Sequence, residues 1–195
     1  PKPSSAASDV YKRQVLQLLW INVIMDTFAA IALCSEPPRA NLMRRPPKGR
    51  GENILTPAML GNIFITGAFF VVTMMALLLG MQRAGWFAGD SPPSGEFAPL
   101  TMRQATLFFT VYVFFQVWNQ INCRSLSPEE SGLHRLFENP QFLLIASLTV
   151  VGQVLIVSLG GAVFHVEPLA LTDWLVVAGG TASVLVFAEV LRRVR

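Results

Sequence analysis

Hydrophobic residues run through the chain in five long stretches, separated by shorter segments that hold nearly all of the charge. The stretches contain only two of the 27 Lys, Arg, Asp and Glu side chains, Asp26 and Glu189. Each stretch approaches the roughly 20 apolar residues that a helix needs to cross ~30 Å of hydrocarbon. The pattern therefore predicts an all-α membrane protein with five transmembrane helices, at about residues 15–34, 58–81, 104–121, 141–160 and 174–191.

The amino-acid composition excludes several classes of protein. The 195-residue chain is 52% hydrophobic and 14% charged, whereas soluble domains are about 25% charged. This balance excludes a soluble globular protein, a disordered tail and a secreted disulfide scaffold. The lipid bilayer is the expected partner, and no nucleic acid is expected. Cys34 and Cys123 are predicted to be unreactive free thiols, with a thiol pair or a metal site as the alternative.

The basic residues of the loops predict the orientation in the membrane. Loop 35–57 holds five Lys or Arg residues, and loop 122–140 and the tail after residue 191 together hold five more. Loops 82–103 and 161–173 together hold only two. Because cytoplasmic loops carry the excess of Lys and Arg, the first loop and the C-terminus are expected to be cytoplasmic. An odd number of spans then places the segment before the first helix outside.

Residues 1–14, PKPSSAASDVYKRQ, differ in character from everything that follows. They are polar, rich in small residues and without a helical apolar stripe. They resemble the translation of a sequencing adapter at the end of a gene fragment, and we exclude them from the functional argument. A genuine short loop is the alternative. The functional domain is expected to occupy residues 15–195.

The first predicted span carries the most informative polar pair. Inserting an aspartate into a membrane span costs ~2.5–3.5 kcal/mol on insertion scales. A specific role is therefore expected for Asp26. Asn22 lies four residues earlier, on the same helix face and one turn away. Amide and carboxylate oxygens are ligands that Ca²⁺ prefers, although two side chains cannot fill its coordination shell. The pair therefore predicts part of a cation site, while the alternative is that Asn22 only bonds Asp26 or a neighbouring helix.

Other polar side chains in the spans are expected to hold helices together. Interhelical amide hydrogen bonds contribute ~0.6 kcal/mol on average. Glu189 is expected to pair with Arg192 and Arg193 at the membrane surface. Gln116 is in addition a candidate for lining a cation pathway. The amide side chains in this class are Asn62, Gln116, Asn119, Gln120, Asn122 and Gln153.

Small and aromatic residues predict packing and interfacial positions. Ala178, Gly179, Ala182 and Ser183 form overlapping small-xxx-small patterns in the last span, which favour close approach of another helix. Trp20 lies toward one end of the first span, as an interfacial tryptophan does.

Three runs of sequence resemble one family of ion pumps. QLLWINVIMDTFAAIALCSEPPRANLMRRPP (residues 17–47) resembles the sixth transmembrane helix and following cytoplasmic loop of P-type calcium-transporting ATPases, the plasma-membrane type most closely. FFQVWNQINCR (114–124) resembles the eighth helix of the same family. The stretch from FENPQFLL to LTDWLVV (137–177) is similar to the ninth helix and the start of the tenth. The resemblance covers nearly all of residues 15–195 and implies the C-terminal part of a longer pump, equivalent to its sixth to tenth helices.

The resemblance also implies which residues bind the transported ion. Asn22 and Asp26 match the asparagine and aspartate ligands of the family's sixth helix. Pumps of the sarcoplasmic-reticulum type have a threonine ligand where this chain has Met25, and a glutamate where it has Gln116. Both departures follow the plasma-membrane type and imply one calcium site rather than two. Gln116 is accordingly not expected to be a ligand.

The same resemblance assigns the remaining chemistry to other parts of the pump. The sequence has no DKTGT-like phosphorylation motif, no GDGxND-like motif and no Gly-rich phosphate loop, so no catalytic residue is expected in this chain. Ca²⁺ is the implied transported ion, and Mg²⁺ and ATP would bind to the missing N-terminal part of the parent. A multi-pass protein of the cell membrane is expected. The alternatives are a non-enzymatic helical scaffold and a P-type pump for another cation, such as Mn²⁺ or H⁺.

Overall fold

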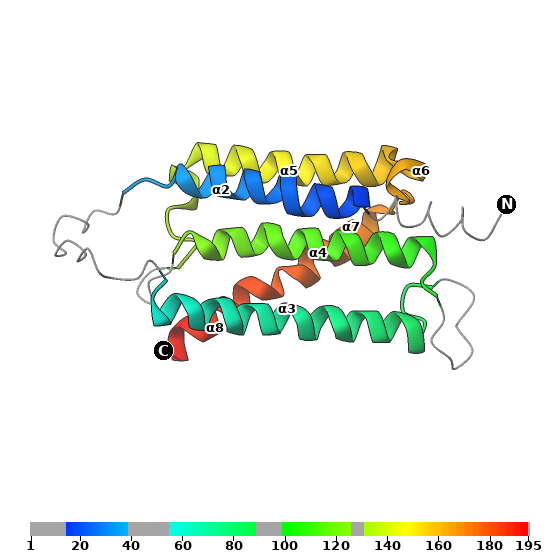
Figure 1. Cartoon of the computed structure of the whole chain (residues 1–195), viewed down its shortest axis with the longest axis horizontal. Coiled ribbons are helices and arrows are strands. Elements are labelled where there is room, and N and C mark those ends of the chain that lie inside the picture. The colour runs from blue at the N-terminus through cyan, green and yellow to red at the C-terminus, as the bar shows by residue number, and fades with distance from the viewer. Residues whose placement is uncertain (1–14, 39–54, 89–98, 126–130, 195) are drawn as a thin grey trace.

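The computed structural model describes residues 15–38, 55–88, 99–125 and 131–194. The predicted leader, residues 1–14, and the basic centre of the first loop, residues 39–54, lie outside the described residues. The described parts form a bundle of long helices that run up and down beside one another, without a strand among them (Figure 1).

The first helix runs from residue 15 to residue 34 and changes geometry on the way. Its middle is the π-helical segment η1 (Trp20–Met25), and it ends as α2 (Asp26–Cys34). The other helices follow in chain order: α3 (Pro57–Arg83), α4 (Met102–Cys123), the short η3 (Leu136–Glu138), α5 (Pro140–Leu159), α6 (Gly161–Phe164), α7 (Leu171–Thr181) and α8 (Ser183–Val194).

Three long helices begin at strong start signals. The side chains of Thr56 and Asn139 each accept a hydrogen bond from the backbone N–H three residues further on, and a proline follows each of them. Thr101 and Gln104 form a reciprocal capping box at the start of α4. These caps satisfy backbone N–H groups that have no partner within the helix. The starts of α3, α4 and α5 therefore lie close to the predicted ones.

Four helical stretches are long and apolar enough to cross a membrane, judged by length and composition. They are Val15–Cys34, Met59–Arg83, Pro140–Leu159 and Leu171–Arg193. These four agree with four of the predicted spans. The remaining predicted span, 104–121, is also a helix, but α4 does not reach the same hydropathy.

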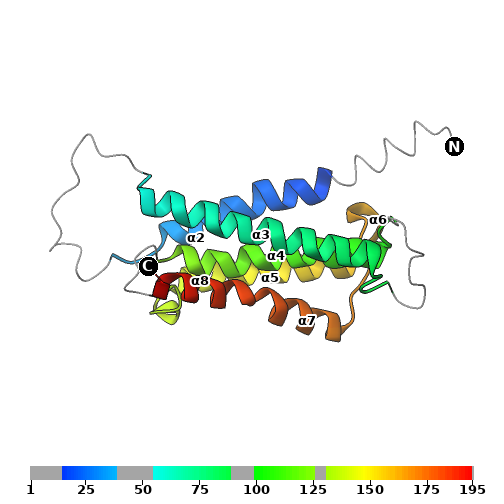
Figure 2. The same ribbon diagram turned by 90° about the horizontal axis from the view of Figure 1, so that it is seen from below.

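The lower hydropathy of α4 has a structural reason. This helix contacts α2, α3, α5, α7 and α8, and it lies between the first helix and the α7–α8 pair (Figures 1 and 2). Eleven of its 22 residues are buried, among them Gln104, Thr106, Thr110 and Gln120. A helix that its neighbours shield from lipid can carry polar side chains that bond within the bundle.

The loops alternate between the two ends of the bundle as the sequence predicts. The ends of α2, α4 and α8 and the starts of α3 and α5 lie together, at what we call the C-terminal end of the bundle (Figure 1). The end of α3 and the starts of α4 and α7 lie at the opposite end. The loops predicted to share one side of the membrane therefore begin and end at the same end of the bundle.

The last predicted span is interrupted between α7 and α8. The Thr181 hydroxyl donates to the Val177 carbonyl (2.6 Å) and accepts from the Trp118 indole N–H (3.0 Å). Ser and Thr side chains that bond to a carbonyl one turn back often bend helices. A methyl group added at Gly179 would meet no described atom within 4 Å, so the predicted close helix contact is not seen among the described residues.

Candidate functional site

The two predicted ligands lie in the part of the first helix where its geometry changes. Asn22 is within η1 and Asp26 is the first residue of α2. Both residues are exposed on the surface of the bundle. Met25, between them, is only 6% exposed and packs against Phe109, Val113 and Val117 of α4. One side of η1 is thus fixed to the bundle core, while the amide and the carboxylate remain uncovered.

The surroundings of this pair determine what it can do chemically. Within the described parts of the chain, neither side chain makes a hydrogen bond, and no group of three His, Cys, Asp or Glu residues is placed to hold a metal ion. The alternative in which Asn22 bonds Asp26 or a neighbouring helix is therefore not seen in these parts. Single π-helical turns occur frequently at functional sites. The two exposed side chains can contribute oxygens to a hard cation if further oxygens come from outside the described residues.

Polar contacts hold the N-terminal half of the first helix against α5 and α6. The side-chain amide of Gln17 donates to the Phe164 carbonyl (2.6 Å), and the Trp20 indole N–H donates to Gln153 Oε1 (3.1 Å). The predicted interhelical role of Gln153 is confirmed. Trp20, expected at the membrane interface, instead directs its polar atom into the bundle.

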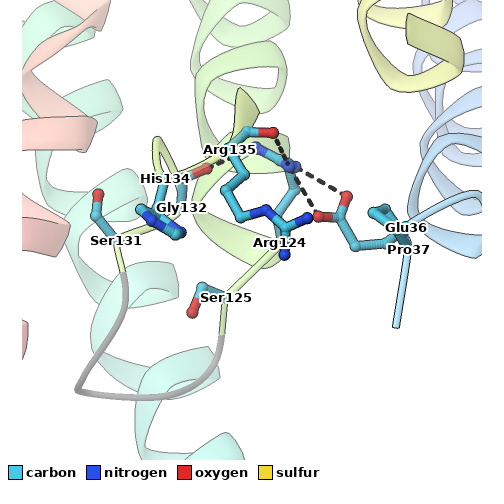
Figure 3. A pocket seen from close by; sticks show the side chains of 8 residues that line it. All are labelled: Glu36, Pro37, Arg124, Ser125, Ser131, Gly132, His134 and Arg135. Carbon is cyan, nitrogen blue, oxygen red and sulfur yellow. Dashed lines mark hydrogen bonds and ion pairs between the residues drawn. The ribbon is translucent and has the colours of Figure 1, made fainter. Parts of the chain in front are cut away.

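An ion pair between a buried arginine and a partly exposed glutamate holds the other end of the first helix. Arg124, after α4, donates from Nε to Glu36 Oε2 (2.9 Å) and from Nη2 to Glu36 Oε1 (2.7 Å), in a bidentate geometry (Figure 3). Asn139 also donates to Glu36 Oε2 (3.1 Å) and to the Ser35 carbonyl (3.2 Å). We call Glu36, Arg124 and Asn139 the Glu36–Arg124 clamp. It joins the chain after α2 to the loop between α4 and α5.

The arginine of the clamp is satisfied on every side. Its side chain is 2% exposed, and Nη1 and Nη2 donate to the carbonyls of Gly132 (2.9 Å) and Arg135 (3.2 Å). The guanidinium carbon lies 5.1 Å from the centre of the Phe142 ring. A small pocket of about 60 Å³ opens beside it (Figure 3), lined by Glu36, Pro37, Arg124, Ser125, Ser131, Gly132, His134 and Arg135. The bonds from Arg124 to these carbonyls hold the segment from Gly132 to Arg135 beside the pocket.

The clamp changes the acidity of Glu36. Burial on its own raises the pKa of this carboxyl. The hydrogen bonds from Arg124 and Asn139 and the positive charges of Arg124 and Arg135 lower it more, so its pKa falls below the ordinary value of 4.5. The clamp therefore holds Glu36 in its charged form.

We expect the clamp to fail only in acid. Because the folded-state pKa of Glu36 is below 4.5, its stabilisation is complete above that pH and is lost as the pH falls through the folded-state pKa. Thermal unfolding of the detergent-solubilised protein between roughly pH 7 and pH 3 measures this loss. Glu36→Gln should lower the midpoint at neutral pH and make the decline in acid shallower. An acid decline that is equally steep in Glu36→Gln would contradict the assignment.

Only some of the other polar side chains in the predicted spans form hydrogen bonds between helices. Asn122 donates from its amide to the Val184 carbonyl (3.3 Å), which confirms its interhelical role. Gln116 donates to the Tyr112 hydroxyl (3.0 Å) within its own helix. The buried amide nitrogen of Gln120 has no partner among the described residues. Glu189 pairs with Arg192 (2.7 Å), as predicted, and also accepts a hydrogen bond from Ser131.

The two cysteines form neither a disulfide nor part of a metal-binding group among the described residues. Cys34 and Cys123 are both free thiols in the structure and both are exposed.

Known proteins resemble almost the whole chain. Residues 14–194 match the family model described as "Cation transporting ATPase, C-terminus". Plasma membrane calcium-transporting ATPase 2 of Oreochromis mossambicus is 34% identical over 168 residues, which cover 83% of this chain and 14% of that protein. A probable calcium-transporting ATPase 6, plasma membrane-type, of Oryza sativa subsp. japonica is 36% identical over 172 residues, 88% of this chain and 16% of that protein.

A third relative covers a similar part of the chain. Calcium-transporting ATPase PAT1 of Dictyostelium discoideum is 33% identical over 161 residues, which cover 82% of this chain and 14% of that protein. The chain thus spans about a sixth or less of the length of these relatives. With its helical architecture and apolar spans, the chain therefore belongs to the family of cation-transporting ATPase C-terminal domains, as the C-terminal membrane region of a P-type ATPase.

Proposed function

We propose that the chain is the C-terminal membrane domain of an ATP-driven calcium pump, and that Asn22 and Asp26 form part of its intramembrane Ca²⁺ site. One observation carries this proposal. An amide within the π-helical segment and a carboxylate at the start of α2 lie four residues apart, and the described helices leave both exposed. A carboxylate at this depth is costly unless it serves a function. Export of calcium from the cytoplasm is the function that fits the family.

The proposed site is incomplete within this chain. Ca²⁺ takes six to eight oxygen ligands, and the two side chains supply only a part of them. The remaining ligands would come from other helices of the pump, toward which the exposed side of η1 faces. The relatives are named calcium-transporting ATPases, which supports Ca²⁺ as the cargo. ATP and Mg²⁺ would bind in the rest of the pump.

The topology of the proposal follows from the helices and the charge pattern. Residues 15–195 form the membrane domain, and the four apolar spans and α4 make five crossings. The C-terminal end of the bundle faces the cytoplasm of a cell membrane, since the loops at that end carry most of the Lys and Arg residues. The Glu36–Arg124 clamp then lies at the cytoplasmic surface.

The metal dependence of phosphoenzyme formation in the complete pump tests the proposed function. Labelled ATP should phosphorylate the purified pump when Ca²⁺ is added, and not with Mn²⁺ or at varied pH in the absence of calcium. Phosphorylation that depends on Mn²⁺ or H⁺ would assign a different cargo. A complete protein that forms no phosphoenzyme with any of these ions would favour a non-enzymatic scaffold.

A further inference from the structure

The helix that carries the proposed ligands rests on α5 through one aromatic side chain. Trp20 is the first residue of η1 and is half-buried. Its indole N–H donates to Gln153 Oε1 over 3.1 Å, and its ring lies against Gly152. Asn22 follows two residues later. The Trp20 ring therefore holds the start of η1 against α5.

Gly152 leaves room for this ring. A methyl group added at Gly152 would lie 2.7 Å from Trp20 Cη2 and 3.1 Å from Cζ2. Real Cβ atoms essentially never come as close as the shorter of these distances. The ring cannot stay in place if residue 152 has a side chain.

Gln153 is itself held at both ends of its amide. It is completely buried, its Oε1 accepts from Trp20, and its Nε2 donates to Thr110 Oγ1 of α4 (3.4 Å). Thr110 in turn donates to the Thr106 carbonyl (2.8 Å). Leaving either end of a buried amide without a partner is unfavourable, because the group has given up its bonds to water. The chain of bonds therefore ties η1 to α5 and α5 to α4.

We propose that Gly152 and Gln153 are positioning residues, which hold η1 in its π-helical register through Trp20 and so set the affinity of the cation site. This inference rests on the proposed function. A π-helical turn acts as a one-residue insertion, and one residue turns an α-helix by about 100°. Loss of the π turn would rotate the segment before it by a similar angle relative to α2. Asn22 and Asp26 would then no longer point in the directions that the site requires. Helix α5 thus affects the site without contributing a ligand to it.

The test compares two alanine substitutions in the complete pump. Gly152→Ala should raise the Ca²⁺ concentration for half-maximal phosphoenzyme formation by about tenfold, the equivalent of ~1.4 kcal/mol. The maximal phosphoenzyme level at saturating Ca²⁺ should be retained. Gly179→Ala adds the same methyl group to a helix where it meets no described atom within 4 Å, and it should leave the affinity unchanged. Equal affinities in the two variants would overturn the proposal.

A second pair of variants separates positioning from a general loss of folding. Trp20→Phe removes the N–H and the outer part of the indole that an added methyl at residue 152 would strike. Adding Gly152→Ala to Trp20→Phe should therefore cause little further loss of Ca²⁺ affinity, and should restore the pump if Gly152→Ala alone fails to accumulate. Additive losses would contradict the proposed contact. If Asp26→Asn leaves Ca²⁺ dependence intact, the proposed site itself fails, whereas normal affinity in Gly152→Ala refutes only the positioning role.

Discussion

Asp26→Asn in the complete pump is expected to abolish Ca²⁺-dependent phosphoenzyme formation and transport. The substitution keeps the size of the side chain and removes its charge, which is the strongest attraction that the described part of the site can offer a hard cation. Labelled phosphate incorporated from ATP, measured over a range of free Ca²⁺, gives the result directly. An unchanged Ca²⁺ affinity in Asp26→Asn would refute the assignment of this residue.

Glu189→Gln is the matched control for this experiment. Glu189 is the only other carboxylate within the predicted spans, but it pairs with Arg192 rather than remaining unbonded. Its neutralisation should leave Ca²⁺-dependent phosphorylation intact. Asn22→Leu should weaken Ca²⁺ binding less than Asp26→Asn does, because it removes a neutral oxygen. A similar loss in Glu189→Gln and Asp26→Asn would indicate that any lost charge harms the bundle.

The alternation of long apolar stretches and charged segments along the chain predicts the apolar helices well. A membrane helix must bond all its backbone groups internally, so an apolar stretch of sufficient length has few other options. The exception is α4, whose position inside the bundle relaxes the need for hydropathy. Its apolar stretch still predicts a helix, and in the structure Thr101 and Gln104 cap the start of that helix. What the pattern does not show is that α4 is the centre of the bundle.

The details of the site were less accessible to sequence reasoning. The spacing of Asn22 and Asp26 indicates a shared face, but no residue pattern marks the π-helical segment around them. Trp20 has the position of an interfacial residue, and only the approach of Gly152 and Gln153 from α5 gives it an interior partner. Contacts between such distant positions depend on tertiary packing, which local spacing does not report.

The Glu36–Arg124 clamp is another feature that only the fold reveals. Its two charged residues are 88 positions apart and lie in loops whose charges the positive-inside pattern already explains. Orientation depends on the number of basic residues in a loop, whereas the clamp depends on where one of them lies in space. The same arginine can therefore serve topology and structure together.

Arg124→Ala should destabilise the folded bundle by about 2–3 kcal/mol, because it removes hydrogen bonds made by a buried guanidinium, which contribute about 1.5–3 kcal/mol when a partner is charged. The substitution leaves Glu36 without its bidentate partner, frees the carbonyls of Gly132 and Arg135, and removes the contact with Phe142. Thermal unfolding of the detergent-solubilised pump should show a lowered midpoint. Arg124→Lys should recover part of the loss, since a lysine keeps the charge without the planar fork.

The exposed pair in the same loop provides the comparison that makes this result specific. Arg135 and Glu138 form an ion pair whose side chains are 44% and 53% exposed, and exposed pairs contribute about 1 kcal/mol or less. Glu138→Gln should therefore leave the unfolding midpoint nearly unchanged. Combining Glu36→Gln with Arg124→Met should cost less than Arg124→Ala alone, because no charge is left unpaired. If Arg124→Ala instead resembles Glu138→Gln, the loop between α4 and α5 is held by other contacts, and the link to α2 has no mechanical role.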